Sequence, residues 1–181
     1  MYQIYREIQT VNHGRMVEII KNNFLFILLI SILAILFGYK SNLAVYVGEW
    51  GTVPDKFEGL MVTIVFLVAL LLYGIVMGYT KKKSFVKFIS LYWGIGGLIG
   101  LISVLMAPIG GFAIIVIPVE IFTIVPTLGL GYFYTVSTGG NTLYLVQILV
   151  SMISSWLVGT IGYLIGYQLK KLRVTRSGIN A

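Results

Sequence analysis

The chain alternates long apolar segments with short polar ones, and this pattern predicts helices. Uncharged apolar runs cover residues 24–39, 59–80, 88–106 and 142–169. An α-helix rises about 1.5 Å per residue, so about 20 apolar residues cross a hydrocarbon core of about 30 Å. The last three runs therefore predict transmembrane helices. The first run is shorter, and its flanking residues are needed to complete a span.

The segment between the third and fourth runs contains the only charge between residues 88 and 169, Glu120. Pro118 and Pro126 flank this acid, and each removes a backbone donor and opposes a regular helix. Glycine-containing turns bound the segment on both sides. The pattern predicts a proline-broken segment with two alternatives. It either crosses the membrane once as a kinked helix or forms a re-entrant hairpin that enters and leaves on the same side.

Basic residues gather where two of the apolar runs end, at residues 81–87 and 170–176. Lysine and arginine mark the cytoplasmic side of a membrane protein, so both clusters indicate that side. They can share it only if an even number of crossings lies between them. A hairpin in the middle segment gives four spans and a cytoplasmic C-terminus, whereas a kinked helix gives five spans and an outer C-terminus. We favour the hairpin because the two prolines suit it.

The composition is that of an integral membrane protein. Hydrophobic residues make up 58% of the 181 residues and charged residues 10%, against about 25% in an ordinary soluble domain. The predicted fold class is an all-α, polytopic transmembrane helix bundle in the plasma membrane. Its predicted parts are a cytoplasmic interfacial helix (residues 1–23), a transmembrane domain (24–169) and a basic cytoplasmic tail (170–181).

The residue types present exclude several kinds of chemistry. The chain has no cysteine and one histidine, His13, so neither a thiolate site nor a multi-histidine metal site is expected. The nucleotide-binding motif with its lysine is absent, and no serine has a plausible base as partner. The net charge of +7 lies largely at the ends of apolar runs, which indicates membrane orientation rather than nucleic-acid binding. We expect no enzymatic activity, no metal and no cofactor.

Glycines recur at helical spacings in the last three predicted helices. Lipid tails are as apolar as leucine, so transmembrane helices associate largely through close packing, which small residues permit. The predicted packing positions are Gly74, Gly78, Gly96, Gly97, Gly100, Gly159, Gly162 and Gly166. They serve either packing within one chain or self-association, for which the segment from Gly162 to Gly166 is the candidate.

Glu120 is the leading candidate for a substrate or ion site. A charged side chain at membrane depth is costly and commonly marks function. Thr123, Tyr134 and Asn141 are the neutral polar residues that we expect to join it. Alternatively, Glu120 belongs to an outer amphipathic segment, where water solvates its charge.

Two stretches resemble the stage II sporulation protein M-like family of small bacterial membrane proteins. Residues 72–78, LYGIVMG, resemble the family's glycine-spaced segment before a basic loop, and residues 118–131, PVEIFTIVPTLGLG, resemble its apolar glutamate segment. The resemblance implies a non-enzymatic membrane component in a Gram-positive type of cell. It also implies a role in envelope remodelling, in an ABC exporter, or in bacteriocin production and immunity.

Three functions remain open at this point. The first is an accessory or immunity-type subunit that acts through partner proteins, which an exposed apolar groove on a solid bundle favours. The second is a small transporter or substrate-binding transporter subunit, which a cavity reaching Glu120 favours. The third is an oligomeric channel, which requires Glu120 to face a central pore. In each case the lipid bilayer surrounds the chain, and the partner is another membrane protein or further copies of this chain.

Overall fold

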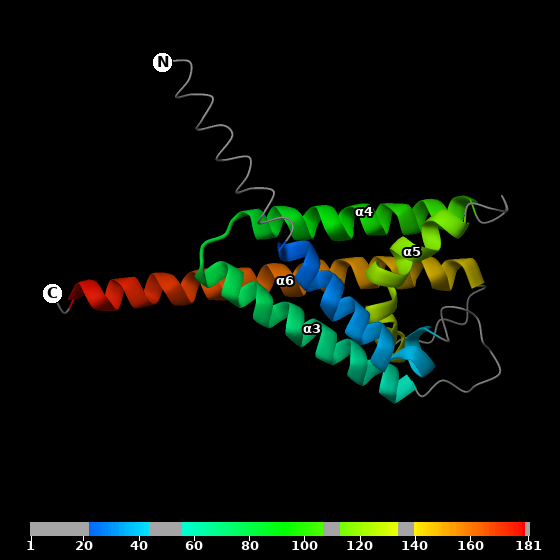
Figure 1. The fold of residues 1–181 in the computed structure, drawn as a ribbon, viewed down its shortest axis with the longest axis horizontal. Coiled ribbons are helices and arrows are strands. Elements are labelled where there is room, and N and C mark those ends of the chain that lie inside the picture. Colours follow the sequence, from blue (N-terminus) through cyan, green and yellow to red (C-terminus); the bar gives the residue numbers. More distant parts are fainter. Residues whose placement is uncertain (1–21, 44–55, 107–112, 134–139, 180–181) are drawn as a thin grey trace, which may run out of the picture.

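The computed structural model describes residues 22–43, 56–106, 113–133 and 140–179. These residues form a helix at Asn22–Phe37, followed by the π-helix η1 (Tyr39–Leu43), α3 (Lys56–Tyr79), α4 (Ser84–Met106), α5 (Ala113–Thr123), the 3-10 helix η2 (Val125–Phe133) and α6 (Gly140–Ile179). The described part of the chain is helical apart from short turns, which confirms the all-α prediction (Figure 1). The predicted interfacial helix falls on residues outside the described part, except for its last two positions.

Among the described residues, three helices are long and apolar enough to cross a membrane. They cover Phe57–Tyr79, Ser84–Ser103 and Leu145–Thr175, and the shorter apolar helix Asn22–Phe37 accompanies them. Large apolar side chains such as Val65 are exposed on the outside of the bundle. Such side chains suit contact with lipid tails rather than water. The chain is therefore a multi-pass membrane protein.

Helices α3 and α6 lie side by side and touch through glycine. A Cβ atom built on Gly74 would lie 2.6 Å from the carbonyl oxygen of Gly159, and one on Gly166 would overlap the carbonyl oxygen of Ile75. Real Cβ atoms essentially never come within 3.0 Å of another heavy atom. These positions therefore accept no side chain unless the two helices move apart. The contact between α3 and α6 is one of backbone against backbone, which is the close packing that small residues permit.

Glycines also bring α4 close to its neighbours. Gly97 lies against the side chain of Met152 in α6, whereas Gly96 faces Thr123 in α5. Gly100 approaches Ile148 of α6. All eight glycines predicted as packing positions have neighbours within 4 Å in the same chain. The glycine faces of α3, α4 and α6 are thus used inside the bundle.

The helix Asn22–Phe37 packs against α3 and completes the core. Its Ile27 is fully buried within a hydrophobic cluster that includes side chains of α3, α4 and α6. Phe26 stacks on Tyr73 with ring centroids 3.8 Å apart. The Tyr73 hydroxyl also donates a hydrogen bond of 2.8 Å to Oδ1 of Asn23. These contacts tie the start of this helix to the last third of α3.

The two basic clusters lie at the same end of the bundle. A tight turn at residues 80–83 joins α3 to α4, and Lys81 within it has a φ of 57°. Arg173 of α6 donates a hydrogen bond of 2.7 Å to the hydroxyl of Tyr79, the last residue of α3. The predicted basic tail continues α6 as a helix to Ile179. This end of α6 projects beyond the α3–α4 turn (Figure 1).

The glycine contact between α3 and α6 predicts a clear difference between two Gly→Ala variants. In Gly166→Ala the new methyl group meets backbone atoms of α3, and overpacking of this kind costs about 1–3 kcal/mol. We expect the melting temperature of the detergent-solubilised protein to fall by about 2–10 °C. Gly94→Ala is the matched control, since nothing lies within 4 Å of a Cβ at Gly94. Equal melting temperatures for the two variants would contradict the packing described here.

Candidate functional site

Helices α5 and η2 form a hairpin, hereafter the α5–η2 hairpin (residues 113–133). It begins near the C-terminal end of α4, where Glu120 contacts Ser103. Further along α4, the hydroxyl of Tyr92 donates a hydrogen bond of 3.5 Å to the carbonyl oxygen of Phe122. Ser103 and Tyr92 are separated by about 16 Å of helix at the usual rise. The hairpin thus extends along about 16 Å of α4.

The second half of the hairpin returns along α3 and α6 to the end from which it came. The hydroxyl of Thr63 in α3 donates to the carbonyl oxygen of Pro126 at 2.9 Å and accepts from the amide of Gly129 at 3.1 Å. Gln147 of α6 donates its side-chain amide to the carbonyl oxygen of Leu128 at 2.9 Å. Two neighbouring helices thus supply polar partners to the backbone of η2.

The local sequence explains where the hairpin turns. Helix α5 continues through Pro118 and ends at Thr123, three residues before Pro126. The amide of Ile124 still bonds to the carbonyl oxygen of Glu120 at 2.7 Å, and the chain then tightens into a 3-10 helix. Hydrogen bonds in 3-10 helices have poorer geometry, so long ones are uncommon. The nine residues of η2 therefore depend on partners from outside the helix.

Glu120 is buried, with 3% of its surface exposed. The hydroxyl oxygen of Ser103 lies 2.5 Å from its Oε1 and 2.7 Å from the carbonyl oxygen of Gly100. A hydroxyl has one hydrogen, so Ser103 can donate to only one of these oxygens at a time. The contact between Ser103 and the carboxyl group links α5 to α4.

The structure brings together only part of the predicted site. Thr123 lies one turn after Glu120 in α5, is buried, and donates its hydroxyl to the carbonyl oxygen of Val119 at 2.8 Å. Tyr134 lies outside the described residues. Asn141 lies in the first turn of α6, and its side chain is outside the described part. Among the described residues, no three His, Cys, Asp or Glu side chains gather where they could hold a metal ion.

Two residues with central polar contacts, Thr63 and Ser103, are not among the predicted site residues. Hydroxyls in transmembrane helices often bond to their own backbone, so a single threonine or serine in an apolar run does not by itself indicate a contact with another helix. Thr63 carried a usable signal, because it is the one polar residue among the apolar residues 60–72. Ser103 carried a weaker one, as the last hydroxyl of the apolar run before Glu120.

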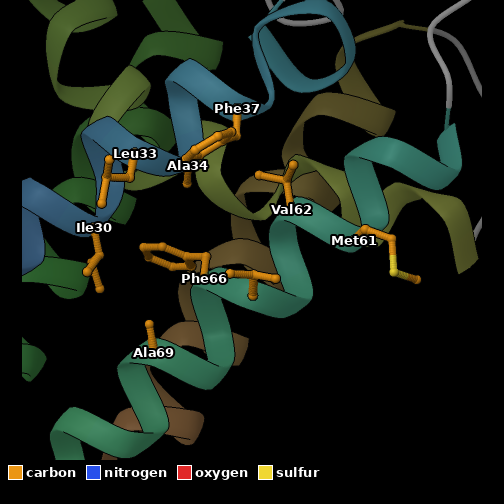
Figure 2. A pocket seen from close by; sticks show the side chains of 9 residues that line it. Ile30, Leu33, Ala34, Phe37, Met61, Val62, Phe66 and Ala69 are labelled. Atoms are coloured by element: carbon orange, nitrogen blue, oxygen red, sulfur yellow. The ribbon is translucent and has the colours of Figure 1, made fainter.

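A second feature is an apolar groove between the helix Asn22–Phe37 and α3, with a volume of about 420 Å³. It is lined by Ile30, Leu33, Ala34, Phe37, Met61, Val62, Val65, Phe66 and Ala69. Figure 2 shows the lining side chains of the two facing helices, with Ile30 and Phe66 directed toward the space between them. Neither Glu120 nor Thr123 lines this groove. The groove and the α5–η2 hairpin are therefore separate features.

The fold defines the class of this protein, an all-helical, multi-pass membrane protein with a short helical hairpin in its bundle. Comparison with protein-family models finds no match, and comparisons with curated proteins and with solved structures find none either. The resemblance to the stage II sporulation protein M-like family therefore stays a prediction.

The contacts of Thr63 predict that a nearly isosteric substitution will loosen the hairpin. Thr63→Val removes the hydroxyl that pairs with both Pro126 and Gly129, and each buried group left unpaired costs about 1–3 kcal/mol. We expect the melting temperature to fall by about 4–20 °C, with faster hydrogen exchange at the Gly129 amide. Thr175→Val is the control, because its exposed hydroxyl bonds only within its own helix, to Lys171. Unchanged exchange at Gly129 would contradict the role given to Thr63.

Proposed function

We propose that this protein is a non-enzymatic accessory or immunity-type subunit of the plasma membrane that acts through a partner membrane protein, such as an ABC exporter. In this proposal, an apolar helix of the partner packs into the groove between the helix Asn22–Phe37 and α3. The observation that carries the proposal is the groove itself, which is lined by apolar side chains alone, exposed ones such as Val65 among them.

The chemistry of the groove supports a helix more than a small molecule. Sites of this volume that bind small molecules usually contain a few polar groups that fix the orientation of the ligand. All nine lining residues here are apolar, and Phe37 is 71% exposed. Helices in membranes associate by shape and close packing rather than by a hydrophobic driving force. A concave apolar surface with a projecting aromatic ring offers that kind of contact.

The transport alternative has less support. Glu120 accepts a hydrogen bond from Ser103, and Thr123 bonds to its own helix. Both side chains thus contribute to the packing of the α5–η2 hairpin. The channel alternative requires Glu120 to face a pore between copies, and a side chain that is 3% exposed within one chain does not favour that arrangement.

The proposed topology has four crossings and one re-entrant hairpin. The helix Asn22–Phe37, α3, α4 and α6 cross the membrane, and the α5–η2 hairpin enters and leaves from the outer side. The shared position of the two basic clusters at one end of the bundle supports this topology, because such clusters favour the cytoplasm. The N-terminus then also lies in the cytoplasm.

The proposed function predicts a specific protein contact at the groove. A photo-reactive amino acid, benzoyl-phenylalanine, placed at Phe37 in cells should form an adduct with one membrane protein of defined mass. The same amino acid at Leu98, which is 58% exposed on α4 and lies outside the groove, is the matched control. Its cross-links should be with lipid, because it is expected to face lipid only.

A second variant tests whether the groove itself holds the partner. Ala69 lines the groove, so Ala69→Trp fills part of it and should abolish the adduct formed from position 37. The melting temperature of the variant checks that the bundle remains folded. Lipid adducts alone at position 37, or the same protein adduct at both positions, would contradict the proposed function.

A further inference from the structure

The end of the bundle where α3 meets α4 carries a cluster of cations, hereafter the basic patch. It consists of Lys81, Lys82, Lys83, Lys87, Lys170, Lys171 and Arg173. Lys170 is half-buried and the other six are exposed. The patch joins two parts of the sequence that lie more than eighty residues apart.

Tyr79 joins the two halves of the basic patch. Its hydroxyl accepts a hydrogen bond of 2.7 Å from Nη1 of Arg173, and its ring lies 5.7 Å from Nζ of Lys170. A cation within about 6 Å of an aromatic ring centroid is attracted to the face of the ring. Since Lys81 follows two residues after Tyr79, these contacts hold the charges of α6 beside those of the α3–α4 turn.

The described residues include little that could neutralise this charge. The acids among them are Glu58, at the opposite end of α3, and Glu120, in the α5–η2 hairpin. Seven like charges at one end of a bundle repel one another and create a strong positive potential. This potential favours an anionic partner at the surface.

The position of the basic patch indicates which anion it meets. The apolar run of α3 ends at Tyr79, and tyrosines in membrane proteins commonly lie at the level of the lipid headgroups. Long lysine and arginine side chains near the end of a span extend to the same level. We propose that the basic patch binds anionic phospholipids through their headgroup phosphates. The occupant is a lipid because the patch continues directly from lipid-facing apolar surface, which would contact the acyl chains.

Lipid binding can be measured by native mass spectrometry of the full-length protein in detergent, titrated with phosphatidylglycerol or phosphatidylcholine. We expect phosphatidylglycerol to bind more tightly than phosphatidylcholine, and we expect its binding to weaken as the salt concentration rises. Each cation near an anionic membrane surface contributes roughly a fivefold gain in binding. The double variant Lys83→Gln/Lys171→Gln should therefore weaken phosphatidylglycerol binding by about 25-fold and leave phosphatidylcholine binding unchanged.

Two controls keep this proposal falsifiable. Lys40→Gln removes an exposed charge at the opposite end of the bundle and should leave phosphatidylglycerol binding unchanged. The charge-conserving Lys83→Arg/Lys171→Arg variant should bind phosphatidylglycerol as the unaltered protein does. Equal affinity for the two lipids, or equal losses in Lys40→Gln and the double glutamine variant, would overturn the proposal. The groove is not involved, so this result and the cross-linking result at Phe37 can fail independently.

Discussion

The arrangement of this bundle depends on hydrogen-bond partners for the backbone of the α5–η2 hairpin. In the proposed topology, the hairpin ends at membrane depth, where water is excluded and each unpaired backbone group costs several kcal/mol. Thr63 and Gln147 meet this need from two different helices, by bonding to backbone groups of η2. The hairpin can occupy its position only while α3 and α6 hold these side chains against it.

This constraint explains the close approach of α3 and α6. Their contact at Gly74, Gly159 and Gly166 places backbone against backbone, which fixes the distance between the helices that bear Thr63 and Gln147. A further close contact, of Gly129 against the backbone of Gly59, seats η2 directly on the start of α3. The glycines therefore do more than make a compact bundle. They hold α3 and α6 at the distance at which Thr63 and Gln147 can both bond to the backbone of η2. Glu120 and Ser103 complete the arrangement by linking α5 to α4.

The sequence predicted the helices better than the contacts between them. Apolar run length reports directly on helices that cross a membrane, so the main helices were expected in the right places. The end of α6 differs because basic residues after Leu169 end the apolar run without ending the helix, which continues to Ile179. The burial of Glu120 and the pairing of Thr63 with Pro126 depend on residues that lie 17 and 63 positions away. The pattern of apolar residues within one helix carries no information about contacts with other helices. The groove could not be predicted from that pattern either, because two different helices line it.

The most direct test asks whether the start of α4 and the C-terminal end of α6 lie on the same side of the membrane. The chain has no cysteine, so single variants Ser84→Cys, Thr175→Cys and Tyr39→Cys can be labelled in intact cells with an impermeant thiol reagent. We expect Tyr39→Cys to react from outside, and Ser84→Cys and Thr175→Cys to react only after the membrane is opened. Labelling of Thr175→Cys from outside, with Ser84→Cys protected, would mean that the middle segment crosses the membrane once, and it would contradict the re-entrant hairpin.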